Sequence, residues 1–441
     1  MSDKLHLILG AGPCGLAAAK ALKAHNIPYI QVEADHEVGG NWLHGVYPTA
    51  HIISSKSITE YPDYPMPADY PDFPSAAQMC AYYQNYARDH GLYEHLRFHT
   101  TVTSIAPVAD NAWRVGFADG STEDFAGVVL CNGHHWDANW PEIPGTFNGE
   151  YIHSKYYKDP QQLMHKTTVV IGAGNSACDL ASESARLGSE TYLAMRSGIY
   201  FIPKTIGGKP SADSPMAKWP LWLQRPMVKW TLKFMQGDYE KDYGLKRPDH
   251  NLFEKHPTVN DEVLYYIKHG RIQPMANVTR FDGDEVVFED GRRVRADLVV
   301  AATGYHLSYP FLPDALQRVD GHYVRSLGEA VLPDYRGIYF MGWQQFRGGV
   351  GQVFTPLAEL TAQYILLQKT LDVPVGAYLQ HRGTKAPTTH LRDPYELIAS
   401  ARKFQKIALR ETGRAQRFAR VRGPLDNEPL AATVAREMVL Y

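Results

Sequence analysis

Two glycine-rich turns of one type, beginning at residues 10 and 172, constrain the fold of this 441-residue chain more than any other feature. Each turn follows a short apolar run and precedes a helix-like segment, which is the strand, turn and helix order that a dinucleotide-binding fold requires. Glycine permits the tight turn and lets backbone N–H groups approach a pyrophosphate at the helix N-terminus. One such turn is weak support, but two in the correct context predict two nucleotide-binding units.

The residue that ends the strand after each turn indicates which nucleotide binds there. After the first turn, the expected strand 29–32 ends at Glu33. A carboxylate at this place hydrogen-bonds a ribose 2′-hydroxyl and repels a 2′-phosphate, as expected for FAD or NAD. The turn itself would bring five residues to the cofactor: Gly10, Gly12, Pro13, Cys14 and Gly15.

The strand after the second turn ends in the opposite charge. The expected strand 191–195 leads into Arg196, with Ser197 beside it. A guanidinium suits a 2′-phosphate through bidentate contact, although a solvated cation at a strand end is the alternative interpretation. The residues of this turn are Gly172, Gly174, Asn175, Ser176 and Ala177. The sequence therefore predicts FAD in the first unit and NADPH in the second.

The fold class predicted is α/β, with two Rossmann-type dinucleotide-binding domains and the NADPH domain inserted into the FAD domain. We expect residues 1–160 to form the first part of the FAD-binding domain and 161–300 the inserted NADPH-binding domain. Residues 301–372 would complete the FAD-binding domain, and 373–441 would form a C-terminal helical tail. Strands are expected near 98–105, 113–117 and 125–130, and a late helix over 356–369.

Composition excludes several classes of protein. The formal net charge of −2 gives no reason to expect nucleic acid or an anionic membrane as a partner. No apolar run is long enough for a membrane-spanning helix. The nearest candidate, 219–235, is interpreted as a substrate-side lid or core helix, with an interfacial anchor as the alternative. The four cysteines form no CxxC pair and two lie in the nucleotide turns, so they are interpreted as small apolar fillers in a cytoplasmic protein without a secretory signal.

Several motifs resemble those of the flavin-containing monooxygenases, within the wider group that includes Baeyer–Villiger enzymes. The segment 147–157 matches the pattern FxGxxxHxxx[YF], and 39–42 reads Gly-Gly-Asn-Trp. An Ala-Thr-Gly strand end lies at 302–304, and Ser-Ser-Lys at 54–56 resembles the family's segment over the flavin. The resemblance covers about residues 5–370 and leaves the tail unassigned.

The resemblance implies an FAD- and NADPH-dependent monooxygenase. In this family the reduced flavin adds dioxygen at C4a, and the hydroperoxyflavin transfers one oxygen atom to a soft nucleophile, such as the amine nitrogen or sulfide sulfur of a small organic substrate. Tyr157 favours this branch over Baeyer–Villiger oxidation of a ketone, where tryptophan is usual. Two departures keep the second branch open: Ile53 replaces the family's asparagine, and 47–50 resembles the Baeyer–Villiger loop. A reductase or oxidase without oxygen transfer, and a sensor on the same fold, are also left open by the sequence.

The resemblance also places the site residues. Three are expected near the chemistry: His153, Ser54 and Asn260. His153 has the alternative role of bracing backbone carbonyls, and Asn260 that of capping a helix. Beyond the two turns, the residues expected at the cofactors are Gly40, Asn41, Trp42, Thr49, Val102, Asn132, Gly133, Thr303, Gly304 and Gln352. No metal is expected, because the adjacent His134 and His135 cannot both face one ion from a regular element. The expected partners are the substrate and dioxygen, with a homodimer through the tail as a possibility.

Overall fold

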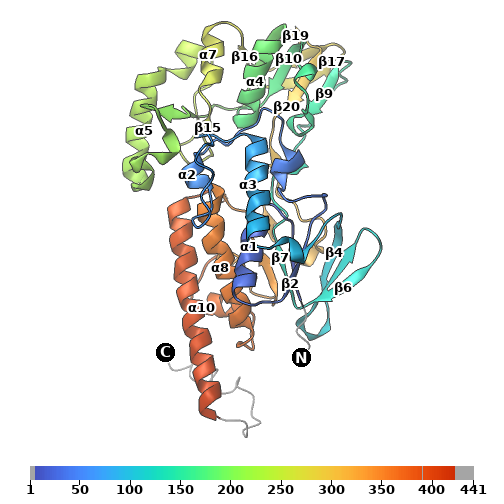
Figure 1. Cartoon of the computed structure of the whole chain (residues 1–441). Coiled ribbons are helices and arrows are strands. Elements are labelled where there is room, and N and C mark those ends of the chain that lie inside the picture. The colour runs from blue at the N-terminus through green and yellow to red at the C-terminus, as the bar shows by residue number, and fades with distance from the viewer. Residues whose placement is uncertain (1–4, 390, 423–441) are drawn as a thin grey trace.

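A computed structural model describes residues 5–389 and 391–422 of the chain. It contains two five-stranded parallel sheets, each built around one glycine-rich turn (Figure 1). The first sheet has the order β24-β7-β1-β2-β3. Its strands are β1 (His6–Leu9), β2 (Tyr29–Val32), β3 (Leu96–Arg97), β7 (Gly127–Leu130) and β24 (Ile338–Phe340). Because β24 comes from late in the chain and pairs with β7, the chain returns to its first sheet after building the second.

The second sheet has the order β16-β11-β10-β20-β9. Its strands are β9 (Glu150–His153), β10 (Thr167–Ile171), β11 (Glu190–Ala194), β16 (Gln273–Met275) and β20 (Leu298–Ala301). The strand β9 carries the histidine of the 147–157 motif and pairs with β20, so this motif forms one edge of the second sheet. The two sheets, both Rossmann-like in order, confirm the predicted α/β class.

Helices such as α1 and α4 cover the sheets, because each places an apolar face against the neighbouring strands. In Figure 1 the first sheet lies below with α1, α8 and α10, and the second lies above with α4 and α7. The longer helices are α1 (Pro13–Ala24), α3 (Ala76–Asp89), α4 (Asn175–Leu187), α5 (Leu221–Gln236), α8 (Val350–Gln368) and α10 (Pro394–Arg422). The shorter ones are α2 (Lys56–Thr59), α6 (Tyr239–Tyr243), α7 (Glu262–Lys268) and α9 (Val375–His381).

Both halves also contain small sheets of two or three strands. The three-stranded ones join β4 (Val102–Pro107), β5 (Trp113–Phe117) and β6 (Thr122–Phe125), and β17 (Val278–Asp282), β18 (Glu285–Phe288) and β19 (Arg293–Arg295). The antiparallel two-stranded ones pair β8 (Asp137–Ala138) with β21 (Tyr305–His306), β13 (Thr205–Ile206) with β14 (Lys209–Pro210), and β22 (Val319–Asp320) with β23 (Tyr323–Val324). Two parallel pairs join β12 (Phe201–Ile202) to β15 (Thr258–Val259), and β25 (Gln345–Phe346) to β26 (Leu391–Arg392).

Two predicted elements differ in extent from those observed. The strand expected over 98–105 is interrupted: β3 ends at Arg97, and β4 begins at Val102 after His99 takes a positive φ of 50°. The late helix begins at Val350 rather than Pro356, because Gly349 serves as its N-cap. A Cβ on Gly349 would lie 2.0 Å from the carbonyl oxygen of Ile58, so only glycine lets this helix start against that backbone.

Within the predicted C-terminal tail, the expected helix over 396–410 lies inside α10 (Pro394–Arg422), and residues 423–441 of that tail lie outside the described part of the chain. The helix α10 is part of the main core. Its apolar side packs on α8 in the same cluster as α1, through Leu397, Ala401, Phe404 and Ala408. For 219–235 the core-helix interpretation is wrong, because Trp222 and Phe234 of α5 are 76% and 80% exposed, whereas the interpretation as a substrate-side lid stays a prediction. Among the helices of residues 5–389 and 391–422, none combines the length and apolarity needed to cross a bilayer.

Candidate functional site

The first glycine-rich turn forms an open helix N-terminus. Gly12 is the N-cap of α1 and no side chain caps it, while Pro13 occupies the first helical position and no acidic residue lies in the first turn. A Cβ on Gly40 would lie 2.7 Å from the Cα of Gly12, so the second motif glycine lies against the turn. Free backbone N–H groups and the positive end of the helix fit a pyrophosphate, and the residues present therefore fit the FAD that this turn predicts.

Glu33 braces this turn through its carboxylate. Its Oε2 atom accepts a hydrogen bond of 2.6 Å from the backbone N–H of Ala11, and its Oε1 atom accepts one from the backbone N–H of Asp35. Gln31, which is fully buried, donates from Nε2 to the carbonyl oxygen of Gly10. Sequence reasoning missed Gln31, since a polar residue inside a predicted strand gave no sign of its target.

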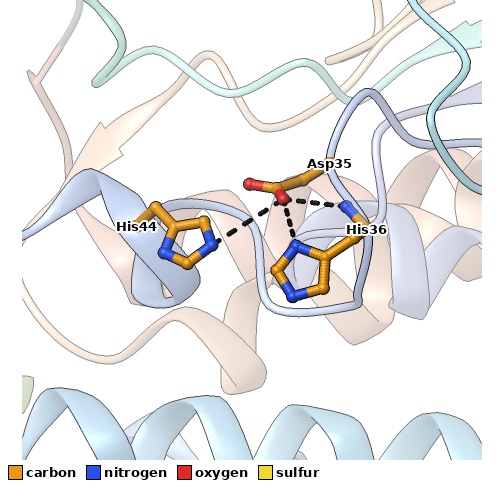
Figure 2. Close-up of side chains that lie close together, drawn as sticks. All are labelled: Asp35, His36 and His44. Atoms are coloured by element: carbon orange, nitrogen blue, oxygen red, sulfur yellow. Dashed lines mark hydrogen bonds and ion pairs between the residues drawn. The ribbon is translucent and has the colours of Figure 1, made fainter.

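A cluster of Asp35, His36 and His44 follows Glu33 (Figure 2). The Nδ1 atom of His36 lies 2.7 Å from Asp35 Oδ1, and His44 Nε2 lies 3.8 Å from the same oxygen. Burial opposes the shift, but hydrogen bonds from His36 and the charge of His44 hold the pKa of Asp35 below its ordinary value. The ligand atoms lie within 4.8 Å of one another, and two imidazoles with a carboxylate suit Zn²⁺. His36 and His44 are exposed and Asp35 is partly exposed, and the two histidines satisfy the carboxylate without an ion. The sequence search for metal ligands considered His134 and His135 instead, and the π-helical turn Asn41–Gly45 brings His44 here.

Two cysteine thiols meet beneath the first turn. The Sγ atoms of Cys14 and Cys131 are 3.7 Å apart, although 117 residues separate them in the chain. Both cysteines are buried and free, and their contact is one that the sequence gave no sign of. Burial and the neighbouring Cys14 raise the pKa of Cys131 well above its usual range, which is the opposite of what a reactive thiol requires. The filler interpretation is consistent with this environment.

The second glycine-rich turn also opens a helix without a cap. Gly174 is the N-cap of α4, no side chain bonds there, and a Cβ built on it meets nothing within 4 Å. Asn175 is held by its Oδ1 atom, which accepts a hydrogen bond of 2.8 Å from the N–H of Val259. Ser176 is half-buried, and Ala177 is buried in the second core. These residues fit the diphosphate of a second dinucleotide.

Arg196 lies at the carboxyl end of β11 with its side chain exposed, beside the half-buried Ser197. A second cation approaches it: Lys246 donates from Nζ to the carbonyl oxygen of Arg196 at 3.3 Å and pairs with Glu289 at 3.1 Å. Two cations beside the ribose end of the turn would favour a 2′-phosphate. Sequence reasoning missed Lys246 because it lies fifty residues from Arg196 in the chain.

Asp179, near the start of α4, joins the two halves of the molecule. Its Oδ2 atom accepts a hydrogen bond of 2.8 Å from the hydroxyl of Tyr47, and its Oδ1 atom accepts one of 2.7 Å from the amide of Asn260. Asn260 also accepts from the N–H of Val263 at the start of α7. The geometry therefore favours the capping role of Asn260, which is fully buried.

Thr49 makes the parallel contact one helical turn further along α4. Its hydroxyl donates to Glu183 Oε2 at 2.9 Å. Trp42 packs against both the first and the second hydrophobic core. The two acidic residues at 179 and 183 have the i, i+4 spacing that places them on one helix face, and this spacing was the signal available in the sequence.

His153 is fully buried at the end of β9, and backbone groups occupy both of its ring nitrogens. Nδ1 accepts from the N–H of Lys155 at 3.1 Å, which leaves Nε2 as the donor to the carbonyl oxygen of Gly304 at 3.0 Å. An Nδ1 that accepts a hydrogen bond requires the neutral ring, and burial, which lowers the pKa of His153, favours the same form. The geometry favours the bracing role over proton transfer.

The other predicted residues take separate places. Ser54 precedes α2 and follows the half-buried Ile53, and its Oγ atom lies 2.7 Å from Oγ1 of Thr59 at the end of α2. In the part of the chain that the structure describes, no hydrogen bond links Ser54, His153 and Asn260 to one another. Asn132 donates to Ser308 and Thr303 to Asn139, while Gly133 and Gly304 have positive φ with open space around them. Val102 is buried at the start of β4, and Gln352 lies in the first turn of α8.

Comparison with known proteins agrees with this geometry. The family model described as flavin-binding monooxygenase-like matches residues 3–357. Flavin-containing monooxygenase 5 of Oryctolagus cuniculus is 31% identical over 83% of this chain and 73% of its own length, whereas its human namesake is matched over 65% of its length. Dimethylaniline monooxygenase [N-oxide-forming] 2 of Macaca mulatta is 28% identical over 81% of this chain and 72% of its own. Cyclohexanone monooxygenase of Rhodococcus sp. Phi1, bound to NADP⁺, shares the fold with a TM-score of 0.69 at 15% identity, over 93% of this chain and 98% of its own.

The family match covers both glycine-rich turns, the 147–157 motif that contains β9, and the start of α8. It confirms the predicted class of oxidoreductase and its two cofactors, FAD and NADPH. The chain belongs to the flavin-binding monooxygenase-like family.

Proposed function

We propose that this protein is an FAD- and NADPH-dependent monooxygenase that transfers one oxygen atom of dioxygen to the amine nitrogen or sulfide sulfur of a small organic substrate. The observation that carries the proposal is the pair of uncapped helix N-termini, at Gly12 and Gly174, in two parallel sheets that Asp179 and Tyr47 connect. One such terminus accounts for a single nucleotide. Two of them, in parts of the molecule that the hydrogen bond from Tyr47 to Asp179 links, support electron transfer between two dinucleotides in one molecule.

Each half has a distinct proposed task. Residues 1–160 and 301–372 form the FAD-binding part, with Gly10, Gly12 and Gly15 at the pyrophosphate and Glu33 at the ribose. Residues 161–300 bind NADPH, with Gly172 and Gly174 at the diphosphate and Arg196 at the 2′-phosphate. FAD, when bound, supplies the redox chemistry that takes electrons from NADPH and activates dioxygen.

The protein's own residues position and enclose the reactants. His153 holds the backbone at Gly304, where the second part of the FAD domain begins, and so fixes the junction between the two parts. Asn260 and Tyr47 hold Asp179 between the halves. These are positioning roles, as expected where a bound cofactor supplies the chemistry. A cytoplasmic location and a homodimer remain predictions.

A second candidate reaction is Baeyer–Villiger oxidation of a ketone, which the sequence Tyr47-Pro48-Thr49-Ala50 favours. One experiment distinguishes the candidates: the flavin-loaded protein is incubated with NADPH, ¹⁸O₂ and a panel of amines, sulfides and ketones. We expect labelled N-oxides or sulfoxides by mass spectrometry. Labelled esters or lactones would select the second candidate. NADPH oxidation with peroxide and no labelled product would contradict oxygen transfer of either kind.

A further inference from the structure

The helix α5 presents several large apolar side chains to solvent, whereas two glutamine side chains and Leu232 face the protein. Trp222, Trp230 and Phe234 are 76%, 69% and 80% exposed. In contrast, Gln224 and Gln236 on the opposite side are buried. A surface helix of a monomeric protein normally has the reverse arrangement. The exposed side chains recur every four residues, with Pro226 between the tryptophans, and so form one continuous strip. We call Trp222, Pro226, Trp230 and Phe234 the α5 ridge.

Polar contacts on the inner side fix the rotation of α5. Gln224 donates to the carbonyl oxygen of Met216 at 2.7 Å and accepts from Arg347 at 2.9 Å. Arg225 donates from Nε to the carbonyl oxygen of Leu252 at 2.9 Å. Rotating the helix to bury the ridge would break these bonds and leave the Arg347 guanidinium without its amide partner. The outward ridge is therefore built into the fold.

Large aromatic rings dominate the ridge. Trp230 and Phe234 stack with their centroids 5.9 Å apart and their planes at 13°. Trp219, before the helix, is 40% exposed, and Met227 and Met235 are 40% and 49% exposed. A contiguous apolar patch of this kind marks a site of interaction rather than ordinary surface. Trp in particular favours the boundary between water and lipid, where its ring meets both.

The charge of the segment is as distinctive as its apolar side. Between residues 214 and 237 there is no aspartate or glutamate, whereas Lys218, Arg225, Lys229 and Lys233 are all basic. The chain as a whole carries a formal charge of −2, so this positive segment is a local feature that the net charge conceals. Lys218 and Lys233 are exposed beside the ridge. Long cationic side chains next to aromatic rings fit a surface that offers apolar depth and negative charge together.

We propose that the α5 ridge docks the protein onto the surface of an anionic lipid bilayer. The helix lies in the plane of the interface, with Trp222, Trp230 and Phe234 inserted at the level of the headgroups and Lys218 and Lys233 against lipid phosphates. The contact is peripheral, which agrees with the absence, among the described helices, of one able to span a bilayer. The inner side of α5 contacts Arg347, which precedes the loop that opens α8, so the docked helix is linked directly to the start of α8.

Vesicle binding by the full-length, flavin-loaded protein tests the proposal. Sedimentation with vesicles of phosphatidylcholine, with and without phosphatidylglycerol, gives the affinity. We expect binding to the anionic vesicles that weakens with added salt. The double variant Trp230→Ser/Phe234→Ser should weaken binding about 100-fold, because two exposed aromatic side chains no longer enter the bilayer. The double variant Lys218→Gln/Lys233→Gln should weaken it about 30-fold, with each cation contributing about tenfold or less.

A matched double variant serves as the control. Leu409→Ser/Lys406→Gln removes one exposed apolar side chain and one exposed cation from α10 and should bind vesicles as the unaltered protein does. Vesicles whose lipids carry a quencher in the headgroup region should decrease the tryptophan fluorescence of the unaltered protein. The decrease should be lost when Trp222 and Trp230 are replaced. Flavin content and NADPH oxidation without vesicles check that the ridge variants fold.

Four results would overturn the proposal: no binding to anionic vesicles, equal binding to neutral ones, unchanged binding by the ridge variants, or equal loss in the α10 control. A concentration-dependent dimer that the ridge variants convert to monomer, without vesicle binding, would instead assign the ridge to a second copy of the chain. None of these measurements depends on oxygen transfer, so the docking surface and the proposed reaction fail independently.

Discussion

The hydroxyl of Tyr47 donates a 2.8 Å hydrogen bond to Asp179, and this contact joins the loop after the Gly-Gly-Asn-Trp motif to the first turns of α4. Burial, followed by the charge of Asp179, raises the pKa of Tyr47 well above its usual range, so the hydroxyl remains a donor at every physiological pH. Tyr47 and Asp179 are 132 positions apart in the chain.

Replacing Tyr47 with phenylalanine tests whether this contact couples the two halves. We expect the free energy of unfolding in urea to fall by about 1.5–3 kcal/mol, the range for a hydrogen bond to a charged group. The KM for NADPH should rise as well, because α4 loses its support. The control Tyr323→Phe removes a tyrosine–aspartate bond within one small hairpin and should leave the KM unchanged. An unaltered KM in Tyr47→Phe would show that the contact is structural only.

Reversing the charge at Arg196 tests the proposed 2′-phosphate contact. Arg196→Glu should raise the KM for NADPH about 10- to 100-fold, since a charge-assisted bond is replaced by repulsion. The KM for NADH should change little, because NADH lacks the phosphate. Lys246→Gln should give a smaller increase of the same selectivity, as the second cation of the pair. Equal effects on the two coenzymes would place the phosphate elsewhere.

A side chain at Gly12 should exclude FAD. A Cβ there would already lie 3.4 Å from the Cα of Gly40, so the further atoms of valine must occupy the open side of the turn. We expect Gly12→Val to be purified without visible flavin absorption, even after incubation with excess FAD. Gly413→Ala, at a helical position with nothing within 4 Å of its Cβ, should remain yellow. Retained flavin in Gly12→Val would contradict the assignment of this turn.

Exchanging Ile53 for asparagine restores the residue that the family resemblance leads us to expect. Ile53 is half-buried beside Ser54, and a polar amide there should support oxygen transfer. We predict that Ile53→Asn lowers the fraction of NADPH oxidation that ends as hydrogen peroxide, measured by peroxide release against NADPH consumed. Ile53→Val should leave the fraction unchanged, and an equal decrease in both variants would reject the polar role.

Acid should destabilise the fold through His6. Burial, with a smaller contribution from the charge of Lys369, lowers the pKa of His6 from 6.5 to about 4, against a hydrogen bond with Pro28 that raises it. Between these values the unfolded chain binds a proton that the folded chain does not, so stability falls as pH falls. The loss at pH 4 is about 3 kcal/mol for this group. Between pH 6.5 and pH 4, the urea midpoint of His6→Gln should fall less than that of the unaltered protein. An unchanged pH dependence of the midpoint would show that His6 does not contribute.

Local sequence determined the parts of this protein whose physics is local. The turns at Gly10 and Gly172, the strands that precede them and the charges at Glu33 and Arg196 were predictable, because a tight turn, an apolar strand and a strand-end position depend on residues adjacent in the chain. The same holds for α10, whose helical pattern is visible without its partner α8.

Tertiary structure decided everything that depends on which distant segments meet. The contact of Cys14 with Cys131, the position of Lys246 at Arg196 and the bond from Tyr47 to Asp179 all join residues that only the folded sheets bring together. The outward face of α5 is of this kind as well, because contacts with Arg347 and Leu252, far along the chain, set the rotation of the helix. Periodicity reveals that a helix has two faces, but the surrounding protein determines which of them meets water.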